Sequence, residues 1–186
     1  MRLNYKPLTI KNWNDLESLF GERGACGGCW CMAWRLKSAQ FEKQKGSANK
    51  KAMKKLVKDE EQIGILAYYK NAPVGWCSFA PREKFISLEK SKVLAPVDNE
   101  PVWSITCFFI KREYRRRGLS SELLIAAIKF CRKKGVKILE GYPNVPYAKN
   151  IPAAFAWKGI PASFEKAGFV EVERRSKSRP IMRCYL

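Results

Sequence analysis

Histidine is absent from this chain of 186 residues. Its absence excludes Ser–His–Asp and Cys–His nucleophilic catalysis, and it excludes metal sites built on imidazole ligands. Long apolar runs are missing as well, because the longest clear one, residues 105–110, is much shorter than a membrane span. We therefore expect no membrane anchor, and the lack of an apolar segment after residue 1 predicts a cytoplasmic location.

Acidic residues are scarce, since 17 Asp and Glu oppose 36 Lys and Arg and leave a net charge of +19. A charge this large favours an anionic partner, such as nucleic acid or a phosphate-bearing ligand. Hydrophobic residues make up 46% of the chain, which excludes a disordered protein and suffices for a core. The length predicts one domain over residues 1–186. Seven dispersed cysteines indicate free thiols in a reducing environment.

The hydrophobic pattern predicts an α/β fold. Helices are expected at residues 12–20, 48–58, 120–134 and 161–167. Strands are expected at residues 3–8, 63–69, 74–80, 102–110, 137–142, 169–174 and 180–185. The second and third of these strands predict a hairpin, and the last two predict an antiparallel pair. The strand ending at Ile110, the helix after it and the strand ending at Tyr142 predict a βαβ unit with a parallel pair.

The segment Arg115–Ser121 connects the most apolar strand to a helix. A helix N-terminus exposes unpaired backbone N–H groups and partial positive charge, which suits a pyrophosphate. Gly118 lets a ligand approach the backbone because it has no Cβ, and the arginines add positive charge. An exposed basic turn capped by Ser120 is the alternative. A mononucleotide-type phosphate loop fits less well, because neither G-x-x-x-x-G-K-[ST] nor G-x-G-x-x-G occurs in the chain.

This strand, the RRRGLSS turn and the helix resemble the acetyl-CoA motif [RQ]-x-x-G-x-[GA] of the GNAT superfamily of N-acetyltransferases. Arg115 takes the first position and Gly118 the fourth, while Ser120 stands where the family has Gly or Ala. FEKAGF at residues 164–169 resembles the family's Y-E-K-x-G-F helix end, and the element order agrees over residues 3–185. The resemblance implies a mixed, mostly antiparallel sheet with a parallel central βαβ pair splayed for CoA and helices on both faces.

The resemblance also implies acetyl-CoA as the acyl donor. Backbone N–H groups near Arg116–Ser121 would hold its pyrophosphate, and the backbone of Cys107–Ile110 would pair with its pantetheine arm like an added strand. The implied cofactor-binding residues are Cys107, Phe108, Phe109, Ile110, Arg115, Arg116, Arg117, Gly118, Leu119, Ser120 and Ser121.

Direct attack of an amine on a thioester needs a neutral amine, so a base must take a proton. Without histidine the candidates are carboxylates, and we consider Glu140, near the end of an apolar strand, and Glu100, before the central strand. For Glu140 an ion pair with an arginine is the favoured alternative. For Glu100 and its neighbour Asp98 the favoured alternative is a solvated loop carboxylate.

The proton donor for the leaving thiolate is a second open question. The family often has a tyrosine there as general acid and an asparagine seven residues earlier, whereas this chain has Phe164 and Trp157. Either another group protonates the thiolate, or backbone dipoles and a helix terminus assist its departure. Tyr142 and Tyr147 lie in the right part of the sequence, but their direction is not fixed by it.

Cys26, Cys29 and Cys31 form a C-x-x-C-x-C cluster. A structural zinc wants four ligands, so a cysteine from a strand would have to complete the site, and we predict no metal. The alternatives are a packed turn with buried thiols and a wall of the acceptor pocket, which the family usually covers with this region. If this segment forms a wall of the acceptor pocket, the pocket residues are Trp30, Cys31, Met32 and Trp34. A catalytic thiol is not predicted, because no base of the usual kind accompanies it.

The sequence thus predicts an N-acetyltransferase that moves an acetyl group from acetyl-CoA to a primary amine of a small molecule or peptide, as a monomer or homodimer. A basic nucleic-acid-binding module is one alternative, disfavoured because no aromatic RNP signature is present. A non-catalytic acyl-CoA-binding protein with a Cys-rich structural segment is another. The acceptor is not readable from one sequence.

Overall fold

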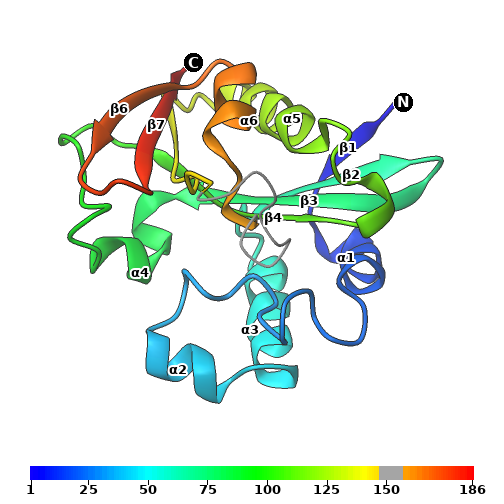
Figure 1. Cartoon of the computed structure of the whole chain (residues 1–186). Helices are drawn as coiled ribbons and strands as arrows, with labels where there is room; N and C mark the ends of the chain where they lie inside the picture. The colour runs from blue at the N-terminus through cyan, green and yellow to red at the C-terminus, as the bar shows by residue number, and fades with distance from the viewer. Residues whose placement is uncertain (147–156) are drawn as a thin grey trace.

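The computed structural model describes residues 1–146 and 157–186, and its strands form one sheet (Figure 1). The strands are β1 (Asn4–Pro7), β2 (Gly64–Tyr69), β3 (Ala72–Pro81), β4 (Trp103–Ile110), β5 (Ile138–Gly141), β6 (Val170–Arg174) and β7 (Pro180–Tyr185). Their order across the sheet is β1-β2-β3-β4-β5-β7-β6. Neighbouring strands are antiparallel except for β4 and β5, which are parallel. The predicted mixed, mostly antiparallel sheet with a parallel central pair is confirmed.

Helices cover both faces of this sheet, as predicted. The α-helices are α1 (Trp13–Phe20), α2 (Ser38–Lys43), α3 (Ser47–Lys58), α4 (Ile86–Glu89), α5 (Leu119–Lys133) and α6 (Pro161–Lys166). Short 3-10 turns lie at η1 (Ile10–Asn12), η2 (Arg82–Lys84) and η3 (Arg112–Tyr114). Figure 1 places α5 and α6 on one side of the sheet and α1 and α3 on the other. Helix α2 was not predicted, because its six residues carry too weak an apolar pattern.

The alternation of side chains along the strands divides the core between the two faces of the sheet. On β2, Ile65 and Ala67 pack in the cluster that includes α5, whereas Leu66 and Tyr68 pack in the cluster that includes α1 and α3. A strand covered on both faces has to be apolar throughout, which explains the continuous hydrophobic runs in the sequence. No helix among residues 1–146 and 157–186 is long and apolar enough to cross a membrane.

Strand β4 positions the site, because it keeps one neighbour along its whole length and loses the other. It pairs with β3 from Trp103 to Ile110 but with β5 only from Trp103 to Ile105. Strand β5 ends at Gly141, where an added Cβ would lie 2.1 Å from Cε1 of Phe164. The ring of Phe164, carried by α6, therefore packs directly on the end of β5, at the point where the parallel strands part.

Candidate active site

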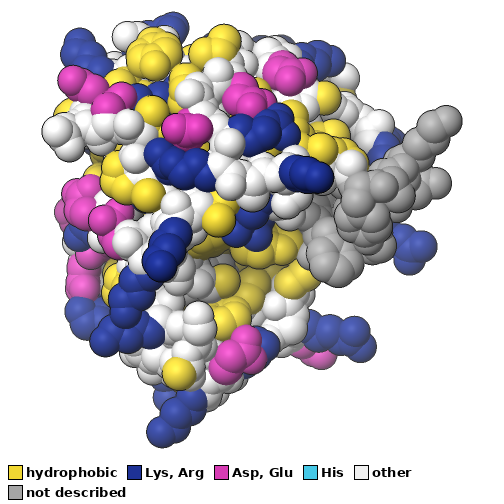
Figure 2. Space-filling model, turned by 60° about the vertical axis from the view of Figure 1, so that its left-hand side comes forward, with side chains coloured by type: hydrophobic (Ala, Val, Ile, Leu, Met, Phe, Trp, Pro, Cys, Tyr) yellow, Lys and Arg dark blue, Asp and Glu magenta, His cyan; other side chains and the backbone are white. Residues whose placement is uncertain are grey.

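A cavity of about 210 Å³ opens where the cysteine-rich segment meets β4. The described residues that line it are Phe20, Ala25, Cys26, Cys29, Cys31, Ala33, Trp34, Phe41, Lys45, Cys107, Phe108, Phe109 and Trp157. Figure 2 shows a face of the molecule on which hydrophobic side chains gather in a hollow with Lys and Arg side chains around it. An apolar cavity with a few polar groups is typical of a small-molecule site.

The cavity reaches the free edge of β4. Three consecutive residues of this strand, Cys107, Phe108 and Phe109, touch it. Successive side chains of a strand point to opposite faces of the sheet, so a cavity that touches all three lies beside the strand and extends past both faces. This edge is the one that β5 has left, since pairing between the two strands stops at Ile105. Its backbone groups are available to a ligand that runs alongside β4.

The basic turn after β4 forms the other end of this edge. Arg115 folds back, and its Nε–H donates to the carbonyl oxygen of Ile110 at 2.8 Å. Arg116 and Gly118 both have left-handed backbone angles, with φ of +59° and +79°. Successive left-handed and right-handed residues turn backbone N–H groups toward one concave side, an arrangement that binds anions.

The N–H groups of this turn fit an anionic ligand. Within the described part of the chain, the backbone N–H groups of residues 116–121 find no acceptor, whereas the N–H of Glu122 bonds to the Gly118 carbonyl at 3.2 Å. A Cβ added at Gly118 would meet nothing within 4 Å, so the space before the turn is open. The hydroxyls of Ser120 and Ser121 instead tie α5 to Ser163 of α6, at 3.0 and 3.1 Å.

On the opposite wall, the structure brings two of the four predicted acceptor-pocket residues to the cavity. Cys31 and Trp34 line it, but Trp30 and Met32 do not, and the exposed fractions of the last two are 4% and 3%. Trp30 turns inward because its ring stacks on Trp13, with ring centroids 6.1 Å apart. Trp30 and Met32 lie in the core instead, since adjacent residues of an irregular segment point in different directions.

A model of the acetyltransferase (GNAT) family matches residues 30–153, which is more than half of the chain. The chain belongs to the GNAT family. The resemblance that the turn at Arg115–Ser121 suggested is thus confirmed. A comparison with curated proteins gave no match.

Solved structures share the fold of this GNAT protein at low sequence identity. PaiA N-acetyltransferase from Thermoplasma acidophilum, in complex with coenzyme A, is 17% identical, with a TM-score of 0.55 and 100% of both chains covered. Ribosomal-protein-S18-alanine N-acetyltransferase from Escherichia coli is 16% identical, with a TM-score of 0.51 and coverage of 99% of this chain and 94% of that chain. Aminoglycoside acetyltransferase AAC(6')-Ib, in complex with coenzyme A, is 16% identical, with a TM-score of 0.53 and coverage of 99% and 95%.

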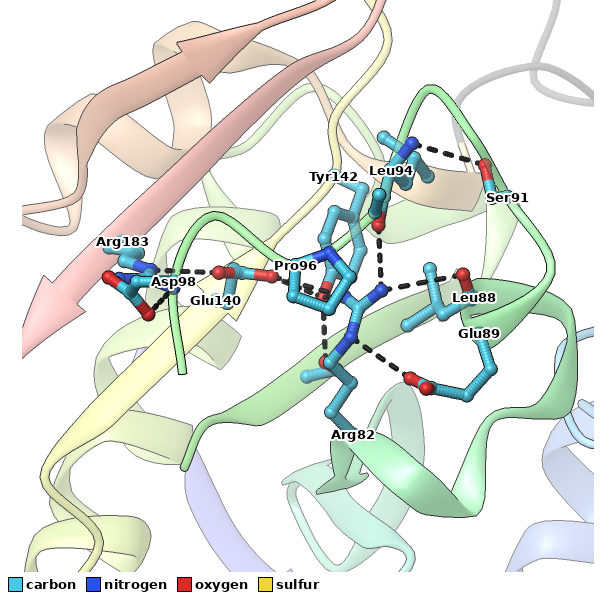
Figure 3. A network of polar contacts seen from close by, with 12 residues as sticks. Arg82, Leu88, Glu89, Ser91, Leu94, Pro96, Asp98, Glu140, Tyr142 and Arg183 are labelled. Carbon is cyan, nitrogen blue, oxygen red and sulfur yellow. Dashed lines mark hydrogen bonds and ion pairs between the residues drawn. The ribbon is translucent and has the colours of Figure 1, made fainter. Parts of the chain in front are cut away.

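In this GNAT protein Glu140 lies in a buried ion-pair network rather than on the cavity (Figure 3). One carboxylate oxygen accepts hydrogen bonds from the Tyr142 hydroxyl at 2.6 Å and from Arg82 at 3.3 Å. The other accepts one from Nε of Arg183 at 2.8 Å. The ion-pair interpretation of Glu140 is confirmed, and because both oxygens are engaged, the structure offers no support for its role as the base.

The second carboxylate candidate, Glu100, is exposed and lies outside the cavity lining. Its backbone N–H donates to Asp98 at 3.1 Å. Asp98 accepts two hydrogen bonds from Arg183, at 2.5 and 2.9 Å, and the guanidinium lowers the pKa of Asp98. Asp98 therefore holds the outer end of the buried network, and neither Asp98 nor Glu100 lines the cavity.

Candidates for the proton donor are also placed by the structure. Phe164 is fully buried, with its ring edge-on to Phe108 and Phe169 at 6.0 and 5.1 Å. The Tyr142 hydroxyl bonds to Ser104, Arg82 and Glu140, and burial raises its pKa well above the ordinary value, so it keeps its proton. Tyr147 lies outside the described residues. Trp157, which replaces the family's asparagine, lines the cavity beside Trp34.

The cysteine cluster is open to the cavity but is not arranged as a metal site. Cys26, Cys29, Cys31 and Cys107 all line the cavity. No group of three or more Cys, Asp or Glu side chains among the residues that the structure describes is placed to hold a metal ion. All seven thiols are free.

Sequence reasoning missed the cavity residues Phe20, Phe41 and Lys45. Phe20 lies at the end of the helix predicted over residues 12–20, and nothing in its spacing separates a core position from a cavity wall. Phe41 and Lys45 belong to α2 and the turn after it, in a part of the chain where no element was predicted. The glycine-rich stretch that precedes them was the available signal, since several left-handed turns bring it back toward the sheet.

Proposed function

We propose that this chain, acting as one domain over residues 1–186, transfers an acetyl group from acetyl-CoA to a primary amine by direct attack. The observation that carries the proposal is the continuity of one path. Unpartnered N–H groups at residues 116–121 stand at one end of the free edge of β4, and the cavity stands at the other. Coenzyme A has phosphates at one end and its sulfur at the other, so the order of its chemical groups suits such a path.

Each part of the path has a defined task. The N–H groups of the turn bind the pyrophosphate, with the partial positive charge of α5 behind them. The free backbone of Cys107–Ile110 holds the pantetheine arm as an added strand and directs the thioester to the cavity. The apolar wall of Trp34, Phe109 and Trp157 keeps water from the acceptor amine. The solved GNAT relatives that hold coenzyme A support this assignment of the donor.

The first test is calorimetry with acetyl-CoA on a matched pair of variants at the two ends of α5. Gly118 and Gly135 have similar φ values, +79° and +74°, and a Cβ at either meets nothing within 4 Å. Gly118→Glu puts a carboxylate where the phosphates bind, and we expect affinity to fall at least about 100-fold because of steric block and charge repulsion. Gly135→Glu carries the same strain and charge, and we expect near-normal binding. Equal losses in both variants, or no binding by the wild type at millimolar acetyl-CoA, would contradict the proposal.

The second test separates an enzyme from an acyl-CoA-binding protein. Free CoA is measured with a panel of polyamines, aminoglycosides, lysine and peptides with free N-termini. We expect release above the rate without an amine for at least one class of acceptor. Binding of acetyl-CoA with no release for any amine would favour the non-catalytic alternative.

A further inference from the structure

The cavity lacks the groups that usually take a proton from an amine. Among its described lining residues there is no Asp, Glu, His or Tyr, and the groups that can accept a proton are the thiols and Lys45. Lys45 pairs with Glu42 at 2.5 Å on the surface, so its side chain is already engaged by a carboxylate. The search for a base therefore moves to the four cavity thiols.

Cys31 is the thiol whose sulfur receives a buried hydrogen bond from an indole. The Nε1–H of Trp76 donates to Sγ of Cys31 at 3.2 Å, and Trp76 is fully buried in β3. A donor aimed at sulfur in a water-free place stabilises the thiolate more than the thiol. Cys31 also has a left-handed φ of +60°, and Trp30 before it has +44°. Strained backbone of this kind tends to occur at functional sites.

Arg35 supplies a second, independent observation. Its side chain is 5% exposed, and Nε and Nη2 have no hydrogen-bond partner. Within residues 1–146 and 157–186 its guanidinium forms no ion pair with a carboxylate, although its charge acts on Cys31. The guanidinium lies over the Phe85 ring at 4.6 Å, and the charges of Cys31 and Glu61 both act on it. A buried cation is costly without a nearby anion, and a thiolate at Cys31 offsets part of that cost. Ser78, fully buried on β3, likewise has a hydroxyl without a hydrogen-bond partner, and this hydroxyl is one of the groups that lower the pKa of Cys31.

The other thiols near Cys31 behave in the opposite way. The largest effect on Cys31 is the hydrogen bond from the Cys107 thiol. Together with Trp76, Ser78 and Arg35 it lowers the pKa of Cys31 from 9.0 to about 7, against the opposing effect of burial. The same hydrogen bond, followed by burial, raises the pKa of Cys107, and burial raises that of Cys29. One thiolate among several thiols is therefore the expected state near neutral pH.

We propose that the Cys31 thiolate is the proton acceptor for the attacking amine, a catalytic role that rests on the proposed acetyl transfer. As the amine nitrogen bonds to the acetyl carbon, its proton passes to the Cys31 sulfur and the carbon–sulfur bond of the thioester breaks with its electron pair on the CoA sulfur. Cys31 then returns the proton to that sulfur and is again a thiolate. Base and acid are one residue, which accounts for the phenylalanine at position 164.

The groups that face Cys31 come from three parts of the fold. The cysteine-rich segment contributes Cys29 and Arg35, β3 contributes Trp76, Cys77 and Ser78, and β4 contributes Cys107. Burial keeps Cys77 protonated, and Arg35 and Trp76 act as positioning residues that hold the sulfur charged. A substitution of Arg35 or Trp76 should therefore shift the pKa of the Cys31 thiol but leave the thiol itself in place.

Thiolate absorbance at 240 nm tests the ionisation without any ligand. We expect wild type and the matched cavity control Cys29→Ser to gain one thiolate with a midpoint near pH 7, and Cys31→Ser to lack this step. Trp76→Phe keeps a buried ring but removes the N–H, and Arg35→Met removes the charge, so both should shift the midpoint upward, while Arg35→Lys restores part of the shift. A step near pH 7 that persists in Cys31→Ser would overturn the proposal.

The second experiment measures turnover with acetyl-CoA and the best amine of the panel. We expect Cys31→Ser to bind acetyl-CoA in the calorimeter as wild type does but to lose at least about 100-fold in kcat, and wild-type activity to fall below pH 7 as the thiolate is protonated. Cys184→Ser removes a free thiol that lies outside the cavity lining and should keep its activity. Normal turnover by Cys31→Ser would sink this proposal and leave the proposed function intact. Failure of wild type to bind acetyl-CoA, or to turn over any amine, would count against both.

Discussion

Glu140 illustrates what a single residue can and cannot disclose. A carboxylate in an apolar strand has to be paired or functional, because an unpaired buried charge is costly. The structure supplies the pairs, Arg82 from η2 and Arg183 from β7, whose positions in the sequence are 58 and 43 residues away. Arg82 also donates to the Leu94 carbonyl at 2.7 Å and thereby anchors the irregular segment before β4.

Glu140→Gln should therefore act on stability. The change leaves two buried guanidinium groups without their shared carboxylate, and we expect a loss of about 3 kcal/mol in the free energy of unfolding, measured in urea. Glu100→Gln, at an exposed position, should change it by less than about 0.5 kcal/mol. A fully stable Glu140→Gln protein with greatly reduced kcat would instead restore Glu140 as the base.

At the scale of elements, the site depends on two parallel strands that part. The sequence predicts β4, α5 and β5 and their parallel pairing, but it does not predict that the pairing stops at Ile105, where the register between β3 and β4 also shifts. Phe164 packs on Gly141 so closely that a side chain at residue 141 has no room. A ring from a helix 23 residues along the chain thus packs against the end of β5, beside the point where the edge of β4 becomes free.

Gly141→Ala tests this contact. Its Cβ would lie 2.1 Å from Phe164, and overpacking of this kind should cost about 1–3 kcal/mol of stability. Phe164→Leu in the same chain should recover part of that loss, which a double-mutant cycle measures as coupling. Gly75→Ala is the control, since its Cβ would approach nothing closer than 3.3 Å. Additive effects of the Gly141 and Phe164 changes would contradict the contact.

At the scale of the whole molecule, the net charge of +19 finds a partial explanation. The turn from Lys111 to Arg117 is basic and stands where the phosphates of the proposed donor bind. The guanidinium of Arg115, however, donates a hydrogen bond to the Ile110 carbonyl. Backbone N–H groups are left as the specific contacts, and the remaining cations contribute a screened field around them.

We expect the affinity for acetyl-CoA to fall severalfold between 50 and 300 mM salt, because ions screen the attraction between the basic surface and the phosphates. The acetyl thioester of N-acetylcysteamine has no phosphates and serves as the control, with a weak but nearly salt-independent interaction. Calorimetry at several salt concentrations measures both. A salt-independent affinity for acetyl-CoA would contradict a role for the net charge in binding.

The order of the main elements and the donor motif could be read from the sequence because their causes are local. Apolar periodicity predicts strands and helices, and the glycine of RRRGLSS marks a turn whose N–H groups are open. The acceptor wall could not be read in the same way. Trp30 and Cys31 are adjacent, yet the ring of Trp30 enters the core and Cys31 lines the cavity, because left-handed turns set their directions one residue at a time.

The sequence alone shows that histidine is missing, and this absence excludes every imidazole base. Which group could replace it was decided by tertiary structure. Trp76 from β3, Cys107 from β4 and Arg35 converge on one sulfur, and no spacing along the chain brings them together. Ionisation depends on burial and on neighbouring donors and charges, which exist once the chain has folded. The composition therefore states what chemistry is unavailable, and the packing determines what chemistry is left.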